Sequence, residues 1–192
     1  MLKNLRDKKI ILASKSPRRQ ELLKGLDLDF EIKTLDVDES YPAKITPIEI
    51  PEFLANKKAA AFQDQLAENV ILITADTIVI QDQTVLEKPS STEEAIAMVT
   101  KLSDQSHTVV TGVCIQSTDK RVVFRDETKV YFNSLSTAEI EYYIENYQPF
   151  DKAGSYGVQE WIGYVGIERL EGSYYNVMGL PVHKVYQTLK SF

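Results

Sequence analysis

The stretch Ile10-Ile-Leu-Ala-Ser-Lys-Ser-Pro-Arg-Arg-Gln-Glu-Leu-Leu23 places a short apolar run just before a helix start, as in an α/β protein. Ser16 and Pro17 favour that start, because serine caps free backbone N–H groups and proline needs no N–H in the first turn. Arg18 and Arg19 follow at the positive end of the helix dipole. With the Ser14 hydroxyl they would suit a phosphate chain, although a solvated arginine pair explains them equally well.

Apolar patterning along the chain predicts alternating strands and helices. The expected helices cover residues 17–26, 51–66, 92–102, 137–147 and 181–190, and the segment 34–50 reads as a loop. The expected strands cover residues 9–14, 29–33, 70–75, 78–80, 85–86, 107–117 and 121–133. The last two are long and joined around Asp119-Lys120, which favours an antiparallel pair. The expected fold is therefore an α/β domain with a mixed twisted sheet.

Composition bounds the architecture and the partners. A chain of 192 residues supports one well-cored domain or two tightly fused lobes, and we expect a single domain over residues 1–192. The net charge of −6 argues against a general nucleic-acid surface, which needs clustered lysine and arginine. The one cysteine, Cys114, excludes an internal disulfide, and its apolar surroundings favour a buried structural thiol.

The sequence lacks the motifs of several classes of catalytic site. The chain has neither the G-x-S-x-G turn of a serine hydrolase nor a G-x-x-x-x-G-K-[ST] phosphate loop. His107 and His183 are the only histidines, too few for a histidine-based zinc centre. The sequence also lacks an apolar leader and an apolar run of membrane-spanning length, so we expect a cytoplasmic protein without a membrane partner.

Four polar groups are candidates for chemistry. Asp76 follows the apolar run 70–75 and could be a metal ligand, a general base or a cap. Lys88, at the mouth of a predicted hairpin, could reach a phosphate or be solvated. The same choice holds for the Lys57-Lys58 pair on a predicted helix. In the glycine-rich segment 151–159, Gln159 could read a base edge, or the glycines could serve only tight turns.

Taken together, these motifs resemble the Maf family of nucleotide pyrophosphatases. The resemblance covers nearly the whole chain, in the family's order. It rests on Ser14-Lys-Ser-Pro-Arg-Arg-Gln-Glu-Leu-Leu23, Lys58-Ala59, Ala75-Asp-Thr-Ile-Val79, Glu87-Lys-Pro89, His107-Thr-Val-Val-Thr-Gly112, Asp151-Lys-Ala-Gly-Ser-Tyr-Gly-Val-Gln159 and Gly172-Ser-Tyr-Tyr-Asn-Val-Met-Gly-Leu-Pro181.

The resemblance implies a fold, a reaction and an assembly. The fold is similar to that of the inosine triphosphate pyrophosphatases, with two lobes around a central cleft. The reaction is hydrolysis of a nucleoside triphosphate to the monophosphate and pyrophosphate, which removes non-standard or excess nucleotides. It uses a divalent metal, Mg²⁺ or Mn²⁺, and the enzymes are usually homodimers.

The resemblance also implies roles for individual residues. Asp76 corresponds to the proton acceptor, and Asp76 with the loop acid Glu39 would hold the metal. The phosphate-binding set is Ser14, Arg19, Lys58 and Lys88. The family's dTTP and UTP subgroup carries arginine, threonine and glutamine at three specificity positions, which here are Arg18, Thr77 and Gln159. A sister subgroup that acts on 7-methyl-GTP differs there.

One departure and one competing hypothesis accompany this reading. After Gln159 the family usually continues with small residues, whereas this chain has Glu160-Trp161-Ile162. Trp161 could stack on the base, narrow the pocket or fill a hydrophobic interface. The competing hypothesis is a nucleotide-responsive regulator of cell division, in keeping with the septum-formation effect behind the family name. The set of Asp76, Glu39 and Lys88 favours catalysis, because a pure binder does not need a water-activating carboxylate.

Overall fold

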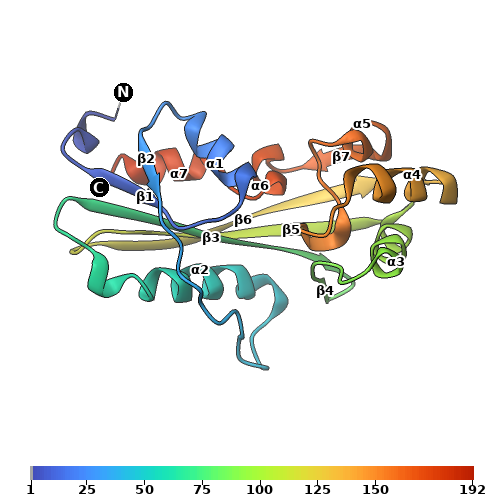
Figure 1. Ribbon diagram of the computed structural model, residues 1–192, viewed down its shortest axis with the longest axis horizontal. Helices are drawn as coiled ribbons and strands as arrows, with labels where there is room; N and C mark the ends of the chain where they lie inside the picture. The colour runs from blue at the N-terminus through green and yellow to red at the C-terminus, as the bar shows by residue number, and fades with distance from the viewer. Residues whose placement is uncertain (1) are drawn as a thin grey trace. The chain divides into compact units, whose positions relative to one another are not determined.

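The computed structural model describes residues 2–192, which contain a mixed β-sheet flanked by helices (Figure 1). The strands are β1 (Lys9–Leu12), β2 (Phe30–Ile32), β3 (Val70–Gln81), β4 (Thr84–Leu86), β5 (Ser106–Gln116), β6 (Arg121–Phe132) and β7 (Ile167–Glu171). The helices are α1 (Pro17–Lys24), α2 (Ile50–Ala60), α3 (Thr92–Leu102), α4 (Thr137–Tyr147), α5 (Trp161–Gly166), α6 (Tyr174–Met178) and α7 (Val182–Leu189).

Strand order and direction confirm the predicted fold class. The order in the sheet is β2-β1-β3-β5-β6-β7, with β4 paired to β3. β1 is parallel to β2 and to β3, whereas β3–β4 and β6–β7 are antiparallel. A backbone hydrogen bond of 2.7 Å from Ser117 N to Lys120 O closes the predicted turn between β5 and β6. The sheet is therefore mixed, with long hairpin-connected strands.

The chain divides into two compact units. Unit 1 contains residues 2–76, Thr111–Asp126 and Gly179–Phe192, and unit 2 contains Thr77–Val110 and Glu127–Met178. β3, β5 and β6 each contribute residues to both units. The single domain expected over residues 1–192 stays a prediction.

Unit 1 is built on β1 and the first half of β3. Figure 1 shows α2 along one face of these strands and α1 and α7 along the other. Ala55 and Ala59 of α2 are fully buried, so this helix packs closely on the sheet. Cys114 lies in the same core, and burial raises the pKa of its thiol to about 11. The predicted structural thiol is thus confirmed.

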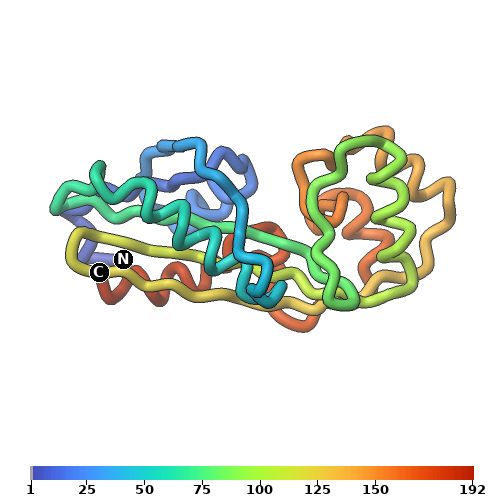
Figure 2. Tube along the Cα trace, turned by 90° about the horizontal axis from the view of Figure 1, so that it is seen from below, coloured from blue at the N-terminus to red at the C-terminus, as the bar shows by residue number. Residues whose placement is uncertain are grey.

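The ends of unit 1 are joined by a side chain near the N-terminus. Asn4 Nδ2 donates to the carbonyl of Leu189 at 2.8 Å and to that of Phe192 at 2.9 Å. In Figure 2 the red C-terminal helix α7 lies next to the blue segment that leads into β1. This contact fixes α7 against the segment that leads into β1.

Gly112 of β5 allows α2 to approach the sheet. A Cβ atom there would lie 2.2 Å from the carbonyl carbon of Pro51 and 2.3 Å from the nitrogen of Glu52. Both are backbone atoms, which a side-chain rotation cannot move aside. We expect Gly112→Ala to destabilise the protein by about 3 kcal/mol, at the upper end for overpacking, as measured by urea denaturation. Gly166→Ala, whose Cβ would meet only side-chain atoms at 3.2 Å or more, is the control, and equal stabilities would contradict this account.

Unit 2 has its own core, centred on α3 and α4. The buried residues of this cluster include Val99 and Leu102 of α3 and Tyr143 of α4. The sequences Ser91-Thr-Glu-Glu94 and Ser136-Thr-Ala-Glu139 have the pattern of a capping box. Both start helices, because Ser91 accepts from Glu94 N and Ser136 accepts from Glu139 N. The reciprocal bond exists only in the second box, since the Glu94 side chain bonds Ser90 instead of Ser91.

His107 lies at the start of β5, as predicted, and is 2% exposed. Its Nε2 shares a 2.7 Å hydrogen bond with the Tyr156 hydroxyl, and burial lowers the pKa of the imidazole to about 3. Unfolding restores the ordinary pKa, so as pH falls protons bind the unfolded chain first. Above about pH 6.5 His107 is neutral in both states and its burial carries no protonation cost. Below that pH the free energy of unfolding falls by about 1.4 kcal/mol per pH unit.

We expect His107→Gln to remove this part of the acid sensitivity. The measurement is urea denaturation of the wild type and the variant between pH 7 and pH 4.5. The difference between the two stabilities should shrink as the pH falls, because only the wild type carries this cost. Replacement of the exposed His183 by Gln is the matched control. Parallel stability curves for the wild type and His107→Gln would show that His107 does not contribute.

The structure corrects three predicted boundaries. β3 continues through Asp76 to Gln81, so Asp76 lies within a strand and not at its tip. The reason is that the apolar run resumes at Ile78, after only two polar residues. The helix expected over 51–66 ends at Ala60, although the apolar spacing continues to Phe62, and a separate 3-10 turn covers Gln63–Gln65. The predicted strand 9–14 ends at Leu12, which leaves Ser14 in the connection to α1.

Candidate functional site

Lys58 brings the two predicted metal-binding carboxylates together. Its Nζ lies 2.7 Å from Asp76 Oδ1 and 2.7 Å from Glu39 Oε1. The Lys58 and Asp76 side chains are 15% and 13% exposed, whereas that of Glu39 is 58% exposed. The cluster therefore has a sheltered side, formed by Lys58 and Asp76, and an open side, formed by Glu39.

The fold places Lys58 opposite Asp76 through contacts between α2 and β3. Thr74 Oγ1 donates to the carbonyl of Ala55 at 2.7 Å. Thr74 and Asp76 lie on the same face of β3, because side chains alternate along a strand. On α2, residues three apart also share a face, so the bond to Ala55 points Lys58 at Asp76. The register of one buried hydrogen bond thus positions the charged pair.

Consecutive lysines of α2 bind consecutive acids of the loop that carries Glu39. Lys57 Nζ donates to Asp38 Oδ2 at 2.9 Å and to the carbonyl of Ser40 at 2.8 Å. Hydrogen bonds from Ser40 and Lys57 hold the pKa of Asp38 well below its usual range. The lysine pair, ambiguous in sequence, therefore anchors the acidic loop through Lys57 and delivers Glu39 to Lys58.

Arg19 lies beside this cluster. Its Nε donates to the carbonyl of Gly179 and its Nη1 to the carbonyl of Ala75, both at 2.8 Å. Burial lowers the pKa of the guanidinium, the neighbouring charge of Arg18 adds to this effect, and Asp76 and Glu39 oppose it. Arginine stays protonated under such conditions. The two carbonyls fix a positive charge next to Asp76.

The start of α1 is capped as predicted. Ser16 accepts from the backbone N–H of Arg19 at 3.4 Å, and Pro17 occupies the first turn. Ser14 is 6% exposed, and its hydroxyl accepts from Ser16 N at 3.2 Å. The predicted residues Ser14, Arg18, Arg19, Glu39, Lys58 and Asp76 all belong to unit 1.

The other three predicted residues, Thr77, Lys88 and Gln159, belong to unit 2. Thr77 follows Asp76 and points to the opposite face of β3. Lys88 is exposed in the connection between β4 and α3. Gln159 precedes α5, and its Oε1 is buried without a hydrogen-bond partner among residues 2–192. Buried polar atoms nearly always have a hydrogen-bond partner, so this oxygen marks Gln159 as a candidate ligand-binding residue.

Trp161, the departure noted in the sequence, packs within unit 2. Its ring lies 4.9 Å from that of Tyr142 in an edge-on arrangement. It also contacts the core cluster that contains Tyr143. Trp161 therefore packs against the hydrophobic core of unit 2, and its stacking on a base, its narrowing of a pocket and its place in an interface stay predictions.

Asp76 and Glu39 suit a divalent cation whose remaining ligands come from the substrate and from water. Within residues 2–192 no three acidic, histidine or cysteine side chains gather into a metal site. Two carboxylates, however, are what Mg²⁺ takes when phosphate oxygens and waters supply the remaining ligands. Asp76 and Glu39 would hold the ion where Lys58 now contacts both. Lys58 would then be released toward the phosphates.

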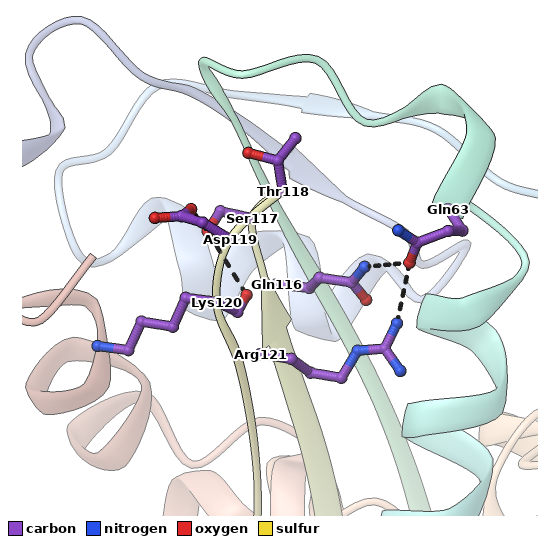
Figure 3. Close-up of a pocket in the computed structure, with 7 residues that line it drawn as sticks. All are labelled: Gln63, Gln116, Ser117, Thr118, Asp119, Lys120 and Arg121. Carbon is purple, nitrogen blue, oxygen red and sulfur yellow. Dashed lines mark hydrogen bonds between the residues drawn. The ribbon is translucent and has the colours of Figure 1, made fainter.

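The structure also has a polar hollow that the predicted site residues do not line. It has a volume of about 200 Å³ and adjoins the turn between β5 and β6 (Figure 3). Its lining residues are Gln63, Gln116, Ser117, Thr118, Asp119, Lys120 and Arg121. Gln116 and Arg121 both donate to Gln63 Oε1, at 2.8 and 3.1 Å.

Two features of the site region are not evident in the sequence. The bond between Thr74 and Ala55 joins residues 19 positions apart, and such pairs carry no local pattern. In unit 2, Tyr143 and Glu160 form a buried polar contact next to Gln159. The only sequence signal for Glu160 was its departure from the small residues expected there.

Comparisons with known proteins agree with the motifs. The Maf-like protein family matches residues 9–192. The dTTP/UTP pyrophosphatase of Parabacteroides distasonis is 55% identical over 193 residues and covers all of both chains. That of Flavobacterium johnsoniae is 52% identical over 98% of each chain.

Among solved structures, the Staphylococcus aureus Ham1 protein aligns with a TM-score of 0.46 at 19% identity, over 65% of this chain and 72% of that chain. In residues 2–192, no helix has the length and apolar character needed to cross a membrane. On the family match and the full-length relatives, the chain belongs to the Maf-like protein family.

Proposed function

We propose that this protein hydrolyses nucleoside triphosphates, with dTTP and UTP preferred, to the monophosphate and pyrophosphate. The observation that carries the proposal is the sheltered contact of Lys58 with Asp76 and Glu39, beside the Arg19 guanidinium. Two positive side chains and two carboxylates in one unit suit a triphosphate bound with a cation. The names of the full-length relatives support the choice of substrate.

Phosphoryl transfer depends on positioning and on charge stabilisation. Asp76 would orient a water molecule toward the α-phosphorus and accept its proton. Arg19 and Lys58 would bind the β- and γ-phosphates and stabilise the departing pyrophosphate, and Ser14 and Lys88 would complete the phosphate-binding set. A divalent cation held by Asp76 and Glu39 supplies charge neutralisation and a more acidic bound water.

Recognition of the base falls to Arg18, Thr77 and Gln159 in this proposal. The Gln159 Oε1 atom, which has no partner among residues 2–192, could accept a hydrogen bond, and N3–H of thymine or uracil is a donor. Cytosine presents an acceptor at N3, so it would leave this oxygen unpaired. The preference for dTTP and UTP over dCTP then follows from one buried acceptor.

The test is pyrophosphate release from a panel of nucleotides, including dTTP, UTP, dCTP, dATP and 7-methyl-GTP, with Mg²⁺ or Mn²⁺. We expect dTTP and UTP to react fastest. Tight nucleotide binding with no turnover across the panel would instead favour the regulator of cell division. Preference for 7-methyl-GTP would assign the sister activity. We also propose a homodimer, which sedimentation analysis of the purified protein tests.

A further inference from the structure

Glu160 belongs to a buried polar network in unit 2. Lys152 Nζ donates to Glu160 Oε1 at 3.0 Å and to Asp151 Oδ1 at 2.8 Å. The Tyr143 hydroxyl donates to Glu160 Oε2, and it accepts from the backbone N–H of Gly157 at 2.9 Å. The Lys152 and Glu160 side chains are 10% and 18% exposed, and Tyr143 is fully buried.

The hydroxyl of Tyr143 has a defined direction in this network. Burial and the neighbouring Glu160 carboxylate raise the pKa of Tyr143 well above its usual range, so the phenol keeps its proton. It therefore donates to the carboxylate and uses its lone pair for Gly157. The result is a continuous chain of hydrogen bonds from Lys152 to the backbone of Gly157.

Gly157 links this hydrogen-bond network to the amide of Gln159. A Cβ atom on Gly157 would lie 2.7 Å from Glu160 Cδ and 3.1 Å from Gln159 Nε2. The carboxylate and the amide therefore both pack directly on this glycine. Any shift of Gly157 or Glu160 changes the space in which the Gln159 amide lies.

A contribution to stability alone is a weak explanation for the network. A buried lysine–glutamate pair loses much of its hydration, and apolar residues of similar size often stabilise a fold as well or better. Such pairs are better attested as devices that fix one conformation. Here the group next to the network is an amide whose oxygen has no hydrogen-bond partner among residues 2–192.

We propose that Glu160, with Tyr143 and Lys152, is a positioning residue that holds the Gln159 amide ready for the N3–H of a pyrimidine base. This inference rests on the proposed function of Gln159. The inference extends that function, because it assigns part of the base selection to Glu160, which stands where small residues were expected. The network acts through Gln159 and does not touch the substrate.

The experiment compares dTTP with N3-methyl-dTTP, which lacks the donor. Tyr143→Phe keeps the ring and removes only the hydroxyl. Because one hydrogen bond contributes about 1.4 kcal/mol, we expect the KM for dTTP to rise about tenfold, with kcat within about twofold. The kcat/KM for N3-methyl-dTTP should not change. Glu160→Ala should behave like Tyr143→Phe, whereas Glu160→Gln, which keeps one of the two acceptor oxygens, should retain part of the preference.

Two controls separate positioning from stability. Glu168→Ala removes an exposed glutamate of the same unit and should change neither nucleotide's kinetics. Thermal unfolding of each variant measures the structural cost. A Tyr143→Phe variant that loses dTTP and N3-methyl-dTTP activity equally would overturn the proposal. So would full retention of the preference in both Tyr143→Phe and Glu160→Ala.

Binding measurements distinguish this proposal from the proposed function. Calorimetry with the α,β-imido analogue of dTTP and its N3-methyl form reports base recognition without turnover. Loss of the binding preference in Gln159→Ala but not in Tyr143→Phe would refute the positioning role and leave the enzyme assignment intact. Absence of turnover in the wild type, with the preference lost in both variants, would refute the enzyme assignment and support the positioning role.

Discussion

Asp76→Asn should lower kcat for dTTP by about a thousandfold, within the range for loss of a general base. The amide keeps the shape of the carboxylate and can still accept the hydrogen bond from Lys58 Nζ. It cannot take a proton from water. Binding of the α,β-imido analogue of dTTP should therefore stay within about tenfold of the wild type.

The measurements are the steady-state kinetics of pyrophosphate release and calorimetry with the analogue. Asp64→Asn is the matched control, because it makes the same change at an exposed acid of the 3-10 turn Gln63–Gln65. We expect it to retain most activity. Turnover of Asp76→Asn near the wild-type rate would show that Asp76 is not the proton acceptor.

Lys58→Met should have the second large effect, in two opposite directions. Loss of the ammonium removes a phosphate ligand, and kcat/KM for dTTP should fall about a hundredfold, as for loss of a charged transition-state contact. Mn²⁺ alone should bind more tightly, because the ion no longer competes with Lys58 for Asp76 and Glu39. Each charge-assisted hydrogen bond contributes about 1.5–3 kcal/mol, so the gain in Mn²⁺ affinity should be about tenfold or more.

Calorimetric titration with Mn²⁺ in the absence of nucleotide measures the second effect. Lys24→Met is the matched control: it removes an exposed lysine of α1 but keeps both contacts of Lys58. Its Mn²⁺ affinity should match that of the wild type. Unchanged or weaker Mn²⁺ binding by Lys58→Met would contradict the exchange of Lys58 for the cation.

The site shows which kinds of feature local sequence can predict. The helix start at Ser16-Pro17 and the capping box at Ser136 were predictable, because a capping side chain and the backbone N–H that it binds are only three residues apart. The hairpin after β3 was predictable for the same reason, and its turn residues Asp82 and Gln83 both have positive φ. The pairing of Lys58 with Glu39 was not, because an exposed loop acid and a helical lysine carry no shared period.

The sequence by itself determined the α/β class, the main helices and strands, and, through motifs in a fixed order, the family. These properties depend on hydrophobic periodicity and on nearby residues. Only the tertiary structure decided that Asp76 lies within a strand and that Lys58 joins it to Glu39. It also placed Glu160 against the glycine on which the Gln159 amide packs. Those relations depend on burial and on contacts between distant residues, because a charged or polar side chain takes its partner from the packing around it.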